Sequence, residues 1–223
     1  MRRRVVLALA LALAVSAPPA RGQDLKTDQD KTFYALGVAI AGQLAPFAPS
    51  AAELELIKAG LTDAALGRPH RAEPREFMTK IQEVRTARAA VVAAAEKKAG
   101  ETFAAKAAAE AGARTLDSGV IITTLKPGTG PSPKATDKVK VHYHGTLTDG
   151  TVFDSSVQRG QPATFTLNGV IKCWTEGVQQ MKVGGKSRLV CPAAVAYGDR
   201  GAPPRIKPGA TLVFEVELLE IVQ

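Results

Sequence analysis

The spacing of apolar residues divides this chain into two parts with different periods. Between Asp24 and about Ala113, apolar residues recur every three or four positions among Ala, Glu, Lys and Arg, which predicts helices. After Arg114 the period changes to two, and Gly, Pro, Thr and Val become frequent, which predicts strands. We therefore expect an α+β protein, with an all-helical N-terminal domain followed by a curved antiparallel sheet wrapped on one short helix.

The helical part should contain three helices. One face of the first carries a stripe of apolar and small residues: Phe33, Gly37, Ile40, Ala41 and Leu44. Ser50 and Glu53 form a capping box at the start of the second helix, which Gly67 and Pro69 end. The third helix begins near Pro74 and continues to about Gly112.

This third helix has unusual length and composition. At 1.5 Å per residue it forms a rod of about 57 Å, in which Gly100 is expected to mark a bend. It continues without another proline through Phe77, Ile81, Val84, Val91 and Ala95. The Ala-rich later part has few large apolar groups to bury. We expect the first two helices and the start of the third to interlock with a second copy, the rest being a spacer; the alternative is a monomeric helical hairpin with a flexible linker.

Alternation identifies the inward faces of the strands. Val139, Val141 and Tyr143 alternate with polar residues, and Asp149-Gly150 then offers a tight turn. Near the C-terminus a second alternating run points inward through Leu212, Phe214, Val216 and Leu218. Between these runs, Trp174, Val178 and Met181 have the spacing of a short amphipathic helix.

The first residues have the pattern of a secretory signal peptide. Three arginines precede an uncharged apolar run from Val5 to Val15, and small residues follow it. The run is shorter than the roughly 20 residues that span a bilayer. We expect cleavage near Ala20 or Gly22, and therefore three segments: a signal peptide (1–22), a helical dimerisation domain with its linker helix (23–113) and a second domain (114–223).

Charge and cysteine content narrow the function classes. Removing the leader removes four arginines and no acid, which leaves 25 basic and 21 acidic residues. Residues 23–113 hold 12 basic and 12 acidic groups and residues 114–223 hold 13 and 9, so we expect no nucleic-acid partner. Export places Cys173 and Cys191 in an oxidising compartment, where they form a disulfide or remain as two buried thiols. No histidine stands beside them, so we expect no metal site.

A scattered set of residues in the second part suggests a site for an apolar ring. Aromatic and branched side chains dominate it, with one carboxylate and one phenol: Tyr143, Phe153, Asp154, Val170, Ile171, Trp174, Tyr197 and Phe214. It contains no obvious nucleophile and no phosphate-binding loop. We expect chemistry that depends on a dry apolar environment, without a cofactor.

These residues stand in motifs that resemble the FKBP-type peptidyl-prolyl cis-trans isomerases. The resemblance extends from about Gly119 to Ile221 through Val141-His142-Tyr143, Gly150-Thr151-Val152-Phe153-Asp154, Val170-Ile171, Trp174-Thr175-Glu176-Gly177, Ala196-Tyr197-Gly198 and Ala210-Thr211-Leu212-Val213-Phe214. The helical part resembles, more loosely, the dimerising arm of bacterial envelope members of the macrophage-infectivity-potentiator type. That second resemblance depends on Tyr34-Ala35-Leu36-Gly37, on the layout and on the long helix.

The resemblance implies a role for each site residue. Trp174 is the floor under a prolyl ring, and the walls and rim are formed by Tyr143, Phe153, Val170, Ile171, Ile206 and Phe214. Tyr197 and the backbone N–H of Ile171 donate to a substrate carbonyl, while Asp154, held by Arg159, orients the peptide. Taken one at a time, Phe214, Val170 and Trp174 are equally consistent with ordinary core, and Asp154 with a turn.

The resemblance also implies the activity and its context. We expect isomerisation of X-Pro bonds in unfolded or proline-containing exported polypeptides, in the periplasm, by a homodimer. The alternative is a dimeric periplasmic holdase chaperone in which isomerase activity is incidental. Three residues depart from the family pattern: Ala163 replaces an aromatic wall, Ala202 a bulkier flap residue and Arg205 an aliphatic one. We expect a more open pocket that still binds macrocyclic FKBP inhibitors.

Overall fold

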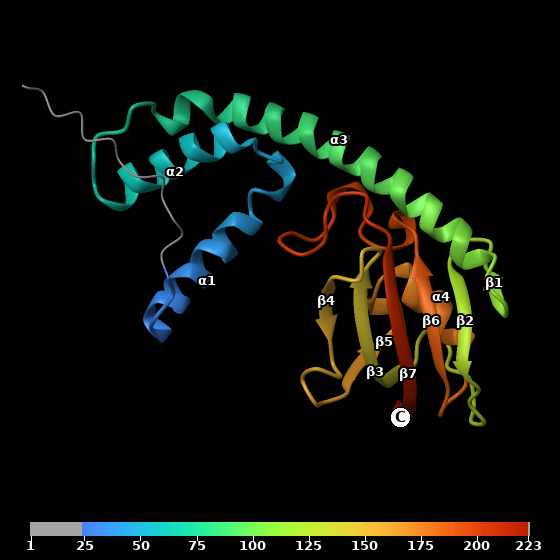
Figure 1. Ribbon diagram of the computed structural model, residues 1–223. Helices are drawn as coiled ribbons and strands as arrows, with labels where there is room; N and C mark the ends of the chain where they lie inside the picture. Colours follow the sequence, from blue (N-terminus) through green and yellow to red (C-terminus); the bar gives the residue numbers. More distant parts are fainter. Residues whose placement is uncertain (1–23, 223) are drawn as a thin grey trace, which may run out of the picture. The chain divides into compact units, whose positions relative to one another are not determined.

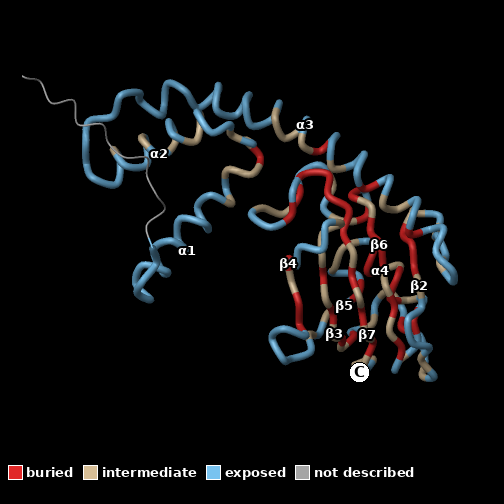
Figure 2. The backbone as a smooth tube through the Cα atoms, in the orientation of Figure 1, coloured by how far each residue is buried: buried red, intermediate tan, exposed pale blue. Residues whose placement is uncertain are grey.

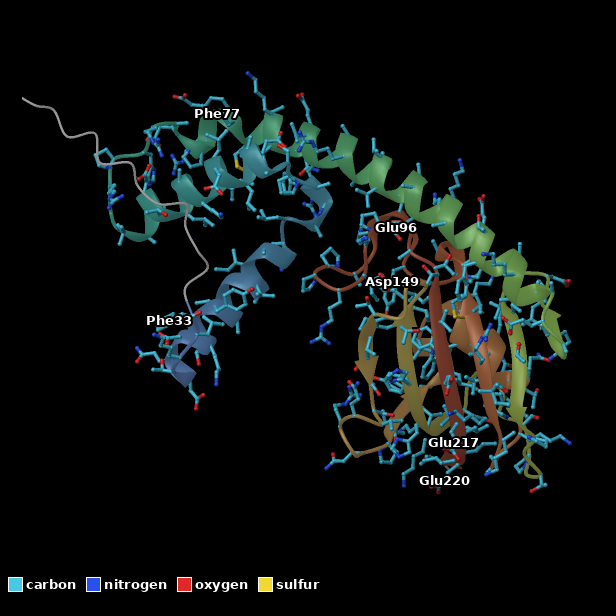
Figure 3. The ribbon with its side chains drawn as sticks, viewed as in Figure 1. Phe33, Phe77, Glu96, Asp149, Glu217 and Glu220 are labelled. Atoms are coloured by element: carbon cyan, nitrogen blue, oxygen red, sulfur yellow. A yellow bond between two sulfur atoms is a disulfide. The ribbon has the colours of Figure 1, made fainter. Side chains whose placement is uncertain are left out.

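The computed structural model describes residues 24–222, so the expected leader and its cleavage site lie outside the described residues. The chain divides into two compact units, with the boundary between Val38 and Ala39. This boundary falls inside the first helix, α1 (Asp28–Gly42). Along α1 every described side chain is at least partly exposed, and Phe33 is 63 % exposed (Figure 3).

The second unit begins with helices that are held together by one arginine. After the short helix η1 (Ala45–Phe47) come α2 (Ala51–Ala65) and α3 (Pro74–Ala108). The capping box predicted at Ser50 and Glu53 is confirmed, since each residue's side chain bonds to the other's backbone N–H. Arg88 of α3 donates to both carboxylate oxygens of Glu53, at 2.6 and 2.9 Å, and to the carbonyl oxygen of Phe47 at 3.1 Å. One guanidinium therefore joins α3, α2 and η1.

A seven-stranded antiparallel sheet follows, as the change of period predicts (Figure 1). Its strands are β1 (Ala113–Thr115), β2 (Ile121–Lys126), β3 (Lys138–Leu147), β4 (Val152–Ser155), β5 (Ala163–Thr166), β6 (Lys186–Cys191) and β7 (Leu212–Val222). Their order is β1-β2-β6-β7-β3-β4, and β5 pairs with β3 beside β4. Short helices lie in the connections: η2 (Leu167–Gly169), α4 (Lys172–Gln179), η3 (Ala193–Val195) and η4 (Gly198–Arg200). The predicted fold class is confirmed.

Helices cover both faces of this sheet. On one face α4 contributes Trp174 and Val178 to the main core, together with the inward side chains of β3 and β7. On the other face Phe103, Ala104 and Ala107 of α3 pack against Ile121 and Val190. Figure 2 shows buried strands and a largely exposed pair of helices α2 and α3, with burial returning in the second half of α3.

The second half of α3 is therefore packed against the sheet domain and does not stand free as a spacer. Its buried residues are Ala93, Gly100 and Ala107, which are seven positions apart, while Val91 is 70 % exposed. Small residues permit the close contact here, and the large side chain of Val91 points away from it. Gly100 does not interrupt the helix. At Gly100 the side chain of Thr211 lies close to the backbone of α3.

Candidate active site

Aromatic rings from four elements meet above the first turn of α4. The alternation of β3 and β7 turns Tyr143 and Phe214 inward, and both rings lie edge-on to Trp174 with centroids 5.3 Å apart. Phe165 of β5 lies 5.5 Å from Trp174, and Phe153 of β4 lies 5.4 Å from Phe214. Near-perpendicular pairs of this kind are favourable beyond their buried area. The indole is therefore held on three sides by rings.

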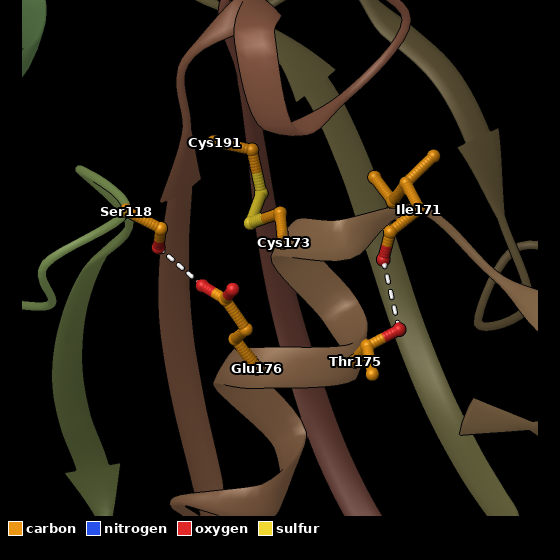
Figure 4. Close-up of a disulfide and its surroundings, with 6 residues drawn as sticks. All are labelled: Ser118, Ile171, Cys173, Thr175, Glu176 and Cys191. Carbon is orange, nitrogen blue, oxygen red and sulfur yellow. Dashed lines mark hydrogen bonds between the residues drawn. A yellow bond between two sulfur atoms is a disulfide. The ribbon is translucent and has the colours of Figure 1, made fainter. Parts of the chain in front are cut away.

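A disulfide anchors the helix that carries this indole. Cys173, in the first turn of α4, is bonded to Cys191, the last residue of β6, with the Cα atoms 5.6 Å apart (Figure 4). Both cysteines are fully buried. In the same helix Thr175 donates to the carbonyl oxygen of Leu167 at 2.5 Å, and Glu176 accepts from Ser118. Trp174 thus lies in a short helix that is tied down on several sides.

The rings enclose a cavity of about 500 Å³ that opens to solvent. Its lining is mainly aromatic and aliphatic, with one carboxylate and two phenols: Tyr143, Phe153, Asp154, Phe165, Gly169, Val170, Ile171, Trp174, Tyr197 and Phe214. Val170 and Ile171 stand at the start of α4, so the backbone N–H of Ile171 lies before the helical hydrogen-bond ladder begins. The site combines an apolar bowl with a few polar groups at its edge.

The carboxylate at the edge belongs to a closed polar network. The hydroxyl of Tyr143 donates to one oxygen of Asp154, and Arg159 donates to the other. Arg159 also donates to the hydroxyl oxygen of Tyr143 at 2.9 Å, and its guanidinium lies 5.6 Å from the centre of the Tyr143 ring. Three side chains therefore fix one another beside the apolar floor.

This network determines which groups are charged. Burial alone would raise the pKa of Asp154, but hydrogen bonds from Tyr143 and Arg159, and the charge of Arg159, lower it below 3.8. Burial, and then the hydrogen bond to Asp154, raise the pKa of Tyr143 above 10.0. At neutral pH the site therefore contains a carboxylate anion, a neutral phenol and a guanidinium cation.

Most of the residues expected from the sequence lie together in this cavity. Tyr143, Phe153, Asp154, Val170, Ile171, Trp174, Tyr197 and Phe214 all line it. Arg159 does not line the cavity but touches it through Asp154 and Tyr143. Ile206 is 5 % exposed, belongs to the main core and does not line the cavity.

Sequence reasoning missed Phe165, which supplies an aromatic wall from β5. Phe165 lies two residues beyond Ala163 on the same face of that strand, where the pairing partners in β3 are Val139 and Val141. The period of two was the available signal, because a strand that turns Ala163 inward also turns Phe165 inward. The small side chain of Ala163 therefore does not leave the pocket without an aromatic wall on that side.

Arg205, which replaces an aliphatic residue of the family pattern, has a partner within the chain. Its guanidinium donates to a carbonyl of the chain itself, that of Phe153, at 2.7 Å. Together with Pro204, Arg159 and residues of β4, it lines a second cavity of about 680 Å³. Arg205 thus holds the flap to the strand that carries Phe153 and Asp154.

Known proteins share this sequence and arrangement. Residues 130–219 match the family model of the FKBP-type peptidyl-prolyl cis-trans isomerases, and residues 29–121 match the domain amino terminal to such isomerases. The isomerase FkpA of Aeromonas hydrophila is 43 % identical over 211 residues, covering 89 % of this chain and 78 % of that protein. The FKBP-type 22 kDa isomerase of Escherichia coli (strain K12) is 40 % identical over 204 residues, covering 88 % and 97 %.

A solved structure agrees with these matches. The crystal structure of FkpA from Escherichia coli superposes with a TM-score of 0.66 at 34 % identity, covering 88 % of this chain and 98 % of that one. The comparisons extend across the helical arm and the sheet domain alike. Sequence, fold and an aromatic cavity edged by a held carboxylate agree, and the chain belongs to the FKBP-type peptidyl-prolyl cis-trans isomerases.

Proposed function

We propose that this isomerase binds the prolyl ring on Trp174 and rotates X-Pro bonds of exported polypeptides in the cavity above it. Rotation meets a barrier of about 20 kcal/mol because the amide loses its resonance. The twisted amide is less dipolar than the planar one. An apolar bowl therefore disfavours the planar ground state more than the twisted transition state, which lowers the barrier without a nucleophile.

The polar groups at the edge have distinct roles in this proposal. Tyr197 and the backbone N–H of Ile171 donate to carbonyls that flank the prolyl ring. Asp154 orients the peptide from the opposite edge, and Tyr143 and Arg159 keep its carboxylate charged and immobile. Phe153 and Phe214 are walls that exclude water from the rotating bond.

The position of Asp154 carries the proposal. Its carboxylate stands beside the apolar bowl, and each of its two oxygens accepts a hydrogen bond from a neighbouring side chain. A carboxylate serving only as a turn residue has no need of this network. Asp149 in the β3–β4 turn provides the comparison, since it accepts from the backbone N–H of Thr151 at 2.9 Å and lies outside the cavity.

The test compares these two carboxylates in a proline-limited refolding assay and with a prolyl tetrapeptide. We expect Asp154→Ala to lower kcat/KM by about tenfold or more, because charged hydrogen bonds of this kind contribute about 1.5–3 kcal/mol. Phe153→Ala should do likewise by opening the wall. Asp149→Ala should retain activity. Equal activity of Asp154→Ala and Asp149→Ala would overturn the assigned role of Asp154.

We also propose that the enzyme works in the periplasm, after removal of residues 1–22. The leader pattern supports export, and the disulfide between Cys173 and Cys191 suits an oxidising compartment. Among the described helices, none has the length and apolar character needed to cross a membrane. Cell fractionation with N-terminal sequencing tests the proposal: an uncleaved protein in the cytoplasm would contradict it.

We propose that a second copy covers the apolar residues of the arm, residues 23–113. Large side chains are exposed on each of its three helices: Phe33, Tyr34 and Leu36 in α1, Leu56 and Leu61 in α2, and Phe77, Met78 and Ile81 in α3 (Figure 3). Exposed large apolar side chains that cluster on a helix mark interaction sites. Sedimentation of the mature protein should show a dimer that Phe33→Glu with Leu36→Glu dissociates. Leu125→Glu, an exposed site on β2, is the matched control.

The same exposed apolar surface supports a second candidate, a holdase that binds unfolded chains. Suppression of aggregation of a proline-independent client measures it apart from isomerisation. If Asp154→Ala loses isomerisation but still suppresses aggregation, the arm has a chaperone function of its own. If suppression is absent in the unmodified protein, the holdase candidate is excluded.

A further inference from the structure

The loop between η3 and β7 carries one of the polar groups of the cavity. This loop, residues 196–211, is called the flap below, and it contains Tyr197 and η4. The side chain of Tyr197 lines the cavity but is 41 % exposed. It is not among the aromatic pairs formed by the described residues. The position of the Tyr197 ring therefore depends on the backbone of the flap.

Two ion pairs join the flap to α3. Lys97 lies 2.5 Å from a carboxylate oxygen of Asp199, which is two residues beyond Tyr197. Lys207 lies 2.9 Å from a carboxylate oxygen of Glu96, and Figure 3 shows Glu96 on the side of α3 that faces the flap. Two adjacent residues of α3 thus hold the flap at two separate positions, Asp199 and Lys207.

The backbone of the flap also approaches α3 closely near these ion pairs, at Gly209. A β-carbon placed on Gly209 would lie 2.4 Å from the carbonyl oxygen of Ala93, and Gly209 has a φ of +76° that favours glycine. The N–H of Gly209 donates to the carbonyl oxygen of Gly198 at 3.0 Å. Since Gly198 directly follows Tyr197, a continuous path of contacts leads from α3 to the cavity.

We propose that Glu96, Lys97 and Gly209 are positioning residues for Tyr197, so that α3 sets the placement of a substrate-binding group as well as connecting two domains. The close contact at Gly209 determines how near the flap lies to the helix. An exposed ion pair contributes little by itself, so the two pairs act together with the Gly209 contact in fixing the lateral position of the flap. An alteration of α3 at these contacts therefore changes substrate binding without touching the cavity.

This inference rests on the proposed role of Tyr197, and the experiment separates the two. The full mature chain carries Glu96→Gln with Lys97→Gln, which removes both ion pairs, and kcat and KM are measured on a prolyl tetrapeptide. We expect KM to rise about two- to fivefold with kcat little changed, because a group that binds ground state and transition state alike is displaced. Gly209→Ala, which forces the flap from the helix, should have a larger effect in the same direction.

A matched control lies at the other end of the helix. Glu110 lies two residues beyond the end of α3 and pairs with Arg188 of β6 at 2.8 Å, away from the flap. Glu110→Gln should leave KM unchanged. Reversing one flap pair, by Glu96→Lys with Lys207→Glu, should restore the KM that Glu96→Lys alone raises. Equal effects of Glu110→Gln and of the Glu96 and Lys97 changes would overturn the proposal, because α3 would then act only through general stability.

Combination with Tyr197→Phe completes the test. In that background the Glu96 and Lys97 changes should have no further effect, since the group that they position is already lost. Additive effects would overturn the positioning role. If Tyr197→Phe lowers kcat/KM while the helix variants behave like the control, the role of Tyr197 stands and positioning by α3 is rejected. If Tyr197→Phe has no effect, both the role of Tyr197 and its positioning are rejected.

Discussion

A β-carbon at position 100 would lie 2.1 Å from the hydroxyl oxygen of Thr211 and 2.9 Å from its β-carbon. Thr211 is 5 % exposed and stands where the flap enters β7. Gly100 thus allows the backbone of the helix to lie directly against the side chain of Thr211. The contact explains a glycine in the middle of a helix, where this residue is otherwise unfavourable by about 1 kcal/mol.

The same substitution should have opposite effects at two helical glycines. Gly60 lies inside α2 and faces open space, so Gly60→Ala should stabilise the protein by about 1 kcal/mol. Gly100→Ala should destabilise it by about 1–3 kcal/mol, because the added methyl group overlaps Thr211. Urea unfolding of both variants provides the measurement. Equal stabilisation by the two changes would show that α3 does not approach Thr211 this closely.

The disulfide should contribute substantially to stability. Cys173 and Cys191 are 18 positions apart, and closing a loop of this size stabilises a protein by about 3 kcal/mol. Replacing both cysteines by alanine should lower the free energy of unfolding by about that amount. Reductant should lower the stability of the unmodified protein and leave the double variant unaffected. An unmodified protein that is insensitive to reductant when unfolded would contradict the prediction.

The contact between α2 and α3 should weaken in acid. A hydrogen bond from Arg88, followed by those of the capping box, lowers the pKa of Glu53 from 4.5 to about 2. The stabilisation is therefore fully present above pH 4.5 and is lost as pH falls toward 2, because the unfolded chain takes up this proton first. Unfolding followed by circular dichroism gives the free energy of unfolding of the unmodified protein and of Glu53→Gln. The difference between the two should shrink as the pH falls from 4.5 to 2. Parallel curves would exclude a role for this carboxylate.

The charge on Asp154 should persist throughout the working range of the enzyme. Its pKa lies below 3.8, so kcat/KM should be flat between about pH 5 and 8. Tyr143→Phe removes a donor that favours the anion and should raise the pKa of Asp154. A ¹³C titration of the carboxyl group measures the shift directly. A lowered or unchanged pKa would show that the Tyr143 hydroxyl does not bond to this carboxylate.

Macrocyclic FKBP inhibitors should bind at micromolar concentration or below. The floor at Trp174 is intact, Phe165 supplies a wall where Ala163 cannot, and Tyr197 remains at the edge. Tyr197→Phe should weaken binding by removing one donor, while Asp149→Ala should not. Calorimetry with the mature protein provides the measurement. No heat of binding at micromolar ligand would mean that the cavity differs in shape from the one described.

Alternation along single strands was enough to predict much of the site. Tyr143 and Phe214 face inward because every second residue of β3 and β7 does, and that rule needs only local sequence. The same rule would have identified Phe165 from Ala163.

Contacts between segments that are distant in the sequence could not be predicted from local sequence patterns. Ala93 and Gly100 carry no apolar signal, yet they bury a helix against the flap because they are small. Arg205 bonds to a carbonyl of β4, and no local feature of its sequence distinguishes this from an exposed rim position. Both depend on how the loop from β6 to β7 folds back.

The unbroken course of α3 gives its length a geometrical meaning. Arg88 holds α2, and five positions later Ala93 meets the flap, with no break in the helix between them. Each residue turns a helix by about 100°, so deleting one residue between these contacts would swing α2 around the helix axis by that angle. Inserting seven there would change the angle by only about 20°. Homologues whose α3 is longer or shorter in this region should therefore differ by multiples of seven residues, because such changes keep α2 at nearly the same angle around the helix axis.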